Sequence, residues 1–181
     1  AVFPMYFVVR VNKVPKKSGY WKKQPEMKGA AKEWDVYSGK YKLYTNYGRD
    51  MAGNDIGYFM QYDLKEGEQV EVQVGVSFVS ITNARENLDK EQPTCDFNRV
   101  VSDSHDAWAR TLDKITVEGG TEDQRRVFYT ALYHTQIHPN ILQDVNGEYP
   151  RMEGDETMKT SGNRYTVFSL WDTYRNLTQL Q

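Results

Sequence analysis

The sequence predicts a multi-domain protein of β and α structure, in which antiparallel strands come first and helices follow. Across Val70–Phe78, apolar residues alternate with polar or small residues, which is the period of a strand with one buried face. After Asp96, apolar residues recur close to helical spacing, as in an amphipathic helix. Because the apolar period changes from two residues to about 3.6, we expect β-structure up to about Ile81 and helices over most of residues 96–136.

The segments that resemble strands are rich in β-branched and aromatic residues. They are Met5–Val11, Val36–Thr45, Asp55–Leu64 and Val70–Phe78. Between the first two, Asn12–Lys32 is rich in lysine, proline and glycine, so we expect a solvated loop there. Asn46–Asn54 and Lys65–Glu68 have the composition of turns. Several strands separated by turns suggest an antiparallel β-sandwich, here without its opening strands.

The first two helices are predicted from apolar spacing and from their end signals. Asn83–Glu91 has the pattern of a short helix, which Pro93 ends. The next helix begins at Asp96 and spans about 17 residues, with an apolar face that includes Trp108. We expect this face to pack against a neighbouring element.

The third helix has the clearest local signal. Thr121 is followed at the third position by Gln124, which is the pattern of a capping box. The helix is expected to run to about Gln136. Another helix is expected to start near Trp171, and Gln179–Gln181 carries no C-terminal stop signal, so we expect the chain to end inside an element.

Composition limits the classes of partner. The formal net charge is −2 and both signs are interspersed, which argues against a nucleic-acid-binding face. Cys95 is the single cysteine, which excludes an internal disulfide framework and a cysteine-based metal cluster. No apolar run approaches the roughly 20 residues of a transmembrane helix. We therefore expect no nucleic-acid partner and no membrane span.

Tyrosine is unusually frequent, with 13 residues in a chain of 181. Several tyrosines are closely spaced in the first half of the chain, namely Tyr37, Tyr41, Tyr44, Tyr47, Tyr58 and Tyr62. A tyrosine on a strand covers a half-buried sheet and keeps its hydroxyl in water. Sheet packing is therefore the favoured interpretation, and an aromatic platform that binds a ligand is the alternative.

Candidate metal ligands are few. His134 and His138 are four residues apart, a spacing that suits zinc on a continuous helix, but Pro139 indicates that the helix has ended and no Glu follows His134. An acidic region resembles a calcium loop without EF-hand spacing; its residues are Asp144, Glu148, Glu153 and Asp155. The sequence therefore assigns no metal ligand within this chain.

The segment Tyr165–Leu177 contains the candidate binding residues. A largely apolar run leads to Trp171 and Asp172 in the first turn of the expected helix. An indole offers a flat apolar face and a fixed carboxylate accepts hydrogen bonds, which together suit a sugar with its C–H faces and hydroxyl rim. The alternative is structural, with Trp171 as a core anchor and Asp172 as an N-cap.

Several short motifs together resemble glycoside hydrolase family 92, the calcium-dependent exo-acting α-mannosidases. The resemblance is dense over residues 70–177 and weak before them. The motifs occur in family order at compatible spacing: Val74–Ser80, Asn83–Leu88, Trp108 with Leu112, Val117–Gly120, Phe128–Thr135, Pro139, Asp144–Tyr149 and Tyr165–Arg175.

The resemblance implies an incomplete β-sandwich over residues 1–82, a helical linker over 83–120 and the start of an (α/α)6 catalytic toroid over 121–181. It implies an inverting hydrolysis by two carboxylates, with Ca2+ bound to mannose hydroxyls. By the same comparison the general acid, the general base and most calcium ligands lie outside this chain, so no catalytic residue is assigned here. Asp172 resembles the carboxylate that hydrogen-bonds mannose in the −1 subsite, and Trp171 flanks it.

The sequence thus suggests part of a bacterial α-mannosidase that removes terminal mannose from glycans. Its partners would be a mannose-containing glycan and the remainder of its own catalytic domain. The expected location is secreted or periplasmic, with the signal peptide not in this chain. The rival hypothesis is a non-catalytic carbohydrate-binding or structural β-sandwich module.

Overall fold

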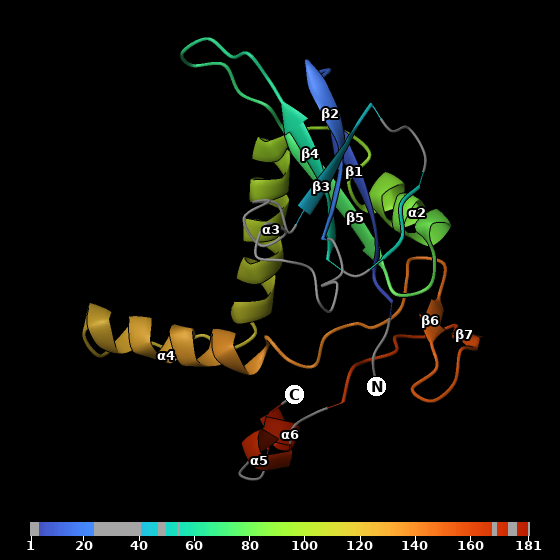
Figure 1. Cartoon of the computed structure of the whole chain (residues 1–181). Helices are drawn as coiled ribbons and strands as arrows, with labels where there is room; N and C mark the ends of the chain where they lie inside the picture. The colour runs from blue at the N-terminus through green and yellow to red at the C-terminus, as the bar shows by residue number, and fades with distance from the viewer. Residues whose placement is uncertain are drawn as a thin grey trace, which may run out of the picture. The chain divides into compact units, whose positions relative to one another are not determined.

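The computed structural model describes residues 4–23, 41–46, 50–53, 55–167, 170–173 and 177–180 (Figure 1). Two compact units are present. The helical unit comprises Ala1–Val11 and Glu71–Gln181, and the three-stranded unit comprises Asn12–Val70. Small antiparallel sheets therefore occur together with helices, which confirms the predicted change from β to α structure.

The helical unit begins with a two-stranded sheet covered by a helix. Strands β1 (Tyr6–Val11) and β5 (Val72–Ser77) pair antiparallel, with Val9 opposite Val74. Helix α2 (Ile81–Glu91) packs against both strands. Its Ala84 and Leu88 are 0% and 2% exposed, so the centre of the apolar core lies where α2 meets the sheet. The predicted strands Met5–Val11 and Val70–Phe78 and the predicted helix Asn83–Glu91 are confirmed.

Helix α2 covers one face of β5, and it is not the face that carries the valines. Gln73, Gly75 and Ser77 are buried under α2, whereas Val74 and its alternate valine neighbours remain about half exposed. The apolar alternation correctly gave a strand but not the face that a helix would cover. Gly75 decides the face, because its missing side chain lets the backbone of α2 approach β5 closely.

Replacing Gly75 by alanine is expected to lower the free energy of unfolding by about 1–3 kcal/mol. The new Cβ would lie 2.3 Å from the carbonyl oxygen of Ala84 and 2.7 Å from Cβ of Leu88, so α2 would have to shift. Gly162→Ala is the matched control, because a Cβ there meets no atom within 4 Å. Urea unfolding followed by circular dichroism measures both. A Gly75→Ala variant as stable as the Gly162→Ala control would contradict the close packing of α2 on β5.

Two longer helices follow in the same unit. Asp96 caps helix α3 (Phe97–Leu112) by accepting a hydrogen bond from the backbone N–H of Arg99. In helix α4 (Glu122–Thr135) the predicted capping box is present, since Thr121 Oγ1 accepts from the N–H of Gln124 and the Gln124 side chain accepts from the N–H of Thr121. Local sequence therefore placed the start of α4 correctly.

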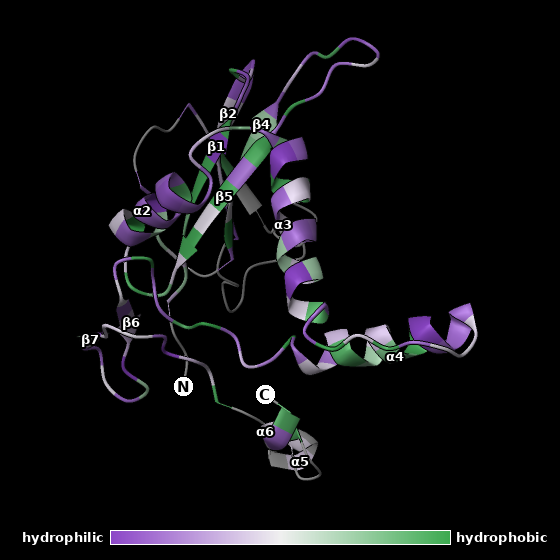
Figure 2. Ribbon diagram, turned by 180° about the vertical axis from the view of Figure 1, so that it is seen from behind, coloured by the Kyte–Doolittle hydropathy of each residue, from purple (hydrophilic) through white to green (hydrophobic). Residues whose placement is uncertain are grey.

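The expected burial of the α3 apolar face is found only near its C-terminal end. There the rings of Trp108 and Tyr133 lie 4.6 Å apart, joining α3 to α4. Within the described residues, no side chain of α3 is buried, and Phe97 is 67% exposed. Polar and apolar residues alternate along both helices (Figure 2). The amphipathic pattern thus predicted the helix correctly and its packing only in part.

The three-stranded unit contains a sheet in the order β3–β2–β4. Its strands are β2 (Lys17–Lys23), β3 (Tyr41–Thr45) and β4 (Ile56–Gln61). The prediction of a solvated loop over Asn12–Lys32 is wrong over Lys17–Lys23, because these residues form the central strand β2. The lysines of this segment gave it the composition of a loop. In the structure Gly19 lies close to the backbone of Tyr44, and the ring of Trp21 lies against Gly57. The strand predictions Val36–Thr45 and Asp55–Leu64 are confirmed at β3 and β4; residues 24–40 lie outside the described residues.

Tyrosines of this sheet pack across strands. Tyr20 lies opposite Tyr44 on one side and Tyr58 on the other. The rings of Tyr20 and Tyr58 meet edge to face with centroids 5.0 Å apart. Such cross-strand aromatic pairs stabilise a sheet, which agrees with the interpretation that these tyrosines pack on the sheet. Tyr37 and Tyr47 lie outside the described residues.

The last part of the helical unit consists of short elements. Strands β6 (Glu148–Pro150) and β7 (Thr157–Lys159) form a small hairpin. Helices α5 (Leu170–Thr173) and α6 (Leu177–Leu180) follow. Among the described helices, none is long and apolar enough to cross a membrane.

Candidate functional site

The candidate binding residues lie on α5. The structure describes α5 (Leu170–Thr173), which confirms a helix near Trp171. Within the described residues the side chain of Trp171 is 89% exposed. Asp172 is the third helical residue rather than the residue before the helix, so its backbone position is not that of an N-cap. The described structure covers only the backbone of Asp172.

A short antiparallel ladder leads to α5. The N–H of Thr166 donates to the carbonyl of Asn140 and the N–H of Leu142 donates to the carbonyl of Arg164, each at 2.8 Å. Between them Ile141 and Tyr165 form a β-bridge. We call residues 140–142 and 164–166 the ladder. The ladder ends at Thr166, five residues before Trp171 in the sequence.

A tight turn connects to this ladder. An Asn-Gly pair favours a tight turn, and here Gly147 has a positive φ of 85° and its N–H donates to the carbonyl of Asp144 at 2.8 Å. The carbonyl of Gly147 accepts from the N–H of Thr160 at 2.9 Å. A Cβ at residue 147 would lie 2.4 Å from the carbonyl oxygen of Thr160. Glycine is therefore needed here for both the turn and the close approach.

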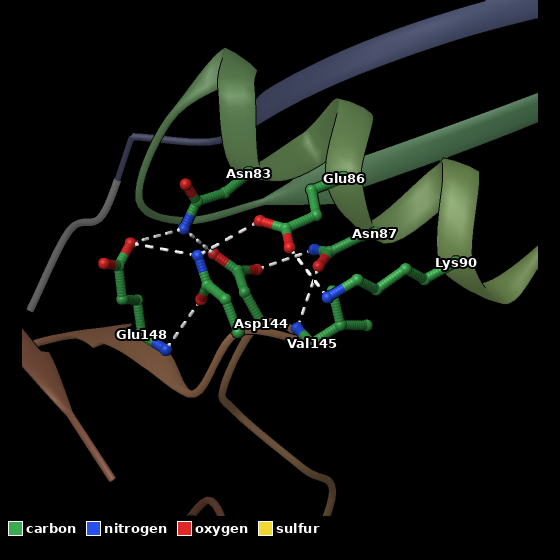
Figure 3. A network of polar contacts seen from close by, with 8 residues as sticks. Asn83, Glu86, Asn87, Lys90, Asp144, Val145 and Glu148 are labelled. Atoms are coloured by element: carbon green, nitrogen blue, oxygen red, sulfur yellow. Dashed lines mark hydrogen bonds and ion pairs between the residues drawn. The ribbon is translucent and has the colours of Figure 1, made fainter.

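Asp144 lies at the centre of a buried polar cluster and is 6% exposed. One carboxylate oxygen accepts from the hydroxyl of Ser77 at 2.7 Å and from the amide of Asn83 at 2.8 Å. The other oxygen accepts from the amide of Asn87 at 2.7 Å. Ser77 lies on β5, and Asn83 and Asn87 lie on α2 (Figure 3). Buried carboxylates need such partners, and here each oxygen has at least one.

The asparagines of α2 make further bonds to the same turn. Asn87 also donates to the carbonyl of Val76 at 2.8 Å and accepts from the N–H of Val145 at 2.9 Å. Asn83 also donates to Glu148 at 2.9 Å. We call Ser77, Asn83, Asn87 and Asp144 the Asp144 cluster. It joins elements that are 57 to 67 residues apart in the sequence.

An exposed ion pair borders the cluster. Lys90 lies 2.8 Å from Glu86 on the next turn of α2, and Asn146 donates to the same carboxylate (Figure 3). The hydrogen bond from Lys90 is the main cause that lowers the pKa of Glu86 from its ordinary value. Because both side chains are solvated, the pair adds little to stability.

The described residues do not fit a calcium site. They contain no group of three or more acidic, histidine or cysteine side chains placed to hold a metal ion. Asp144 already accepts hydrogen bonds on both oxygens, and Glu153 and Asp155 are exposed on the β6–β7 loop. His138 lies beyond the end of α4 and its ring contacts the carbonyl of Val167 at 2.9 Å. The described residues therefore assign no calcium ligand.

Sequence reasoning grouped Asp144 with loop acids and missed its partners. Asn83 and Asn87 are four residues apart on a short helix, which places both amides on one face. Two amides on the face that meets the core are a signal for a buried polar partner. The partner itself could not be identified, because it lies on a distant part of the chain.

Comparisons with known proteins agree with the resemblance. The model of the glycosyl hydrolase family 92 catalytic domain matches residues 83–181. A protein of Arthroderma benhamiae named "Uncharacterized secreted glycosidase" is 32% identical over 126 residues, which cover 66% of this chain and 15% of that protein.

Two solved structures from Bacteroides thetaiotaomicron are similar to this chain. The family GH92 α-mannosidase BT3965 is 28% identical with a TM-score of 0.73, over 97% of this chain and 22% of that one. The inverting mannosidase BT2199 is 22% identical with a TM-score of 0.78, over 98% of this chain and 22% of that one. At this identity the likeness shows the fold alone. The chain thus spans about a fifth of the length of these structures. The family model covers more than half of the chain, which therefore belongs to glycosyl hydrolase family 92.

Proposed function

We propose that this chain works as a segment of an exo-acting, inverting, calcium-dependent α-mannosidase that removes terminal mannose from glycans. Family membership supports the proposal, as does the likeness to the α-mannosidase BT3965. The proposed organisation is the later part of a β-sandwich over residues 1–82, a helical linker over 83–120 and the first elements of an (α/α)6 toroid over 121–181. A relative named as a secreted glycosidase supports a location outside the cytoplasm.

Within this proposal the chain contributes to sugar binding. The observation that carries it is Trp171, whose 89% exposure leaves its indole face open. An aromatic face stacks on the C–H face of a sugar ring, and an adjacent carboxylate can accept hydrogen bonds from two hydroxyls. We assign Asp172 to the mannose of the −1 subsite and Trp171 to its flank.

In this proposal, proton transfer is carried out by residues outside this chain. An inverting glycosidase needs a general acid and a general base whose carboxyl groups are about 6.5–9.5 Å apart, so that a water fits between them. Asp144 cannot serve as either while its oxygens are held by Asn83, Asn87 and Ser77. When bound, calcium would supply charge to mannose hydroxyls, and its ligands are expected mostly outside this chain.

The 181-residue chain by itself is expected to show no turnover of an aryl α-mannoside in the presence of calcium, because the acid and base are expected elsewhere. Release of the aryl group above a buffer blank, after repurification, would contradict this. The complete enzyme should release mannose with inverted configuration at the anomeric carbon, which proton NMR measures. Binding of mannosides without hydrolysis by the complete protein would favour the rival, a non-catalytic carbohydrate-binding module.

A further inference from the structure

The Asp144 cluster lies next to both strands of the ladder that leads to Trp171. Leu142, in the first strand, is two residues before Asp144. The second strand follows Thr160, whose N–H donates to the carbonyl of Gly147 in the same turn. The ladder is thus anchored at both strands to one turn, and that turn is anchored to α2 (Figure 3).

The chemistry of the cluster requires a carboxylate at its centre. The groups that face Asp144 are the hydroxyl of Ser77 and the amide N–H groups of Asn83 and Asn87, all of which donate. A carboxylate is an acceptor only, whereas an asparagine in its place would present one N–H2 group to a donor. At least one of the buried donors would then be left without an acceptor.

We propose that Asp144 is a positioning residue, which fixes the Trp171–Asp172 segment relative to α2 and β5. The expected effect on catalysis rests on the proposed function, whereas the expected effect on the ladder does not. Asp144 does not touch the sugar in this account. It acts through the turn at Gly147 and through the ladder, which the Trp171–Asp172 segment follows in the sequence.

The first test is hydrogen exchange in the 181-residue chain carrying Asp144→Asn. The backbone amides of Leu142 and Thr166 in the ladder are expected to exchange about tenfold faster or more, because a buried hydrogen-bonded group is lost. The amides of β1 and β5 should change by less than about twofold. Asp155→Asn, the same substitution at an exposed residue of the β6–β7 loop, is the matched control and should leave both sets unchanged.

Two results would overturn the proposal. One is unchanged exchange in the ladder of the Asp144→Asn variant. The other is an equal rise throughout the unit, since Asp144 would then act only on global stability. If Asp144→Asn does not fold, Asn83→Ala decides, because alanine suits the helix and Ser77 and Asn87 still donate to Asp144. A smaller rise confined to the ladder is then expected, and no rise would overturn the proposal.

The second test is kinetic and uses the complete enzyme. At a temperature well below the melting transition, Asp144→Asn is expected to lower kcat/KM for an aryl α-mannoside about tenfold, and Asp155→Asn should leave it unchanged. Normal kcat/KM in a folded Asp144→Asn enzyme would overturn the positioning role. Failure of the proposed function is distinguishable, because the complete enzyme would then lack mannosidase activity while the exchange difference at Leu142 and Thr166 remained.

Discussion

Asp172→Ala in the complete enzyme is expected to lower kcat/KM by about 100-fold or more, with little loss of stability. A carboxylate that accepts two charge-assisted hydrogen bonds from sugar hydroxyls contributes about 1.5–3 kcal/mol for each bond. If these bonds strengthen as the sugar ring distorts, the loss appears in kcat as well as in KM. Steady-state kinetics with an aryl α-mannoside and thermal melting of the same preparation measure the two effects separately.

A structural role for Asp172 predicts the opposite pattern. As the third residue of α5 its charge would favour the helix N-terminus by about 0.3–1 kcal/mol, with nearly normal kinetics. Asp123→Ala is a suitable control, because Asp123 is an exposed acid in the first turn of α4. A lower melting temperature with kcat/KM within about threefold of the parent, which is about 0.7 kcal/mol, would remove Asp172 from the binding site.

Leu88→Ala is expected to lower the free energy of unfolding of the helical unit by about 2–5 kcal/mol. Leu88 is 2% exposed and lies, with the buried Ala84, on helix α2 where it packs against β5 and β1. Removing its side chain leaves a cavity between α2 and β5, since Gly75 has no side chain to fill the space. Urea unfolding followed by circular dichroism measures the loss.

Leu64→Ala is the matched control for this substitution. Leu64 is 47% exposed and lies in the three-stranded unit, so its truncation should change the free energy of unfolding by less than about 0.5 kcal/mol. Equal losses in the two variants would show that Leu88 does not hold α2 against the sheet. The Asp144 cluster would then be the main attachment of α2.

The parts of the fold that depend on neighbouring residues could be predicted from the sequence. The capping box of Thr121 and Gln124 is complete within four residues, and the turn at Gly147 needs only its Asn-Gly pair. The family, too, could be recognised, because short motifs kept their order and spacing over residues 70–177. In each case the information lies in a short stretch or in the order of such stretches.

The candidate site could be predicted only as a place on the chain. Trp171 and Asp172 were found from residue type, and the structure adds that Trp171 is exposed and that Asp172 is the third residue of α5. Their assignment to a sugar stays a prediction. The Asp144 cluster could not be predicted, because nothing near Asp144 in the sequence indicates a hydrogen bond to Asn83 or Asn87.

The sequence by itself determined the period of each element, the helix caps, the tight turn and the family. Tertiary structure decided which face of β5 helix α2 covers, since a glycine permits closer approach of a helix than a row of valines does. It also decided that the lysine-rich segment Lys17–Lys23 is a central strand, because pairing on both sides satisfies its backbone. Finally it decided the environment of Asp144, because the donors that bond to this buried carboxylate are distant in the sequence and only folding brings them together.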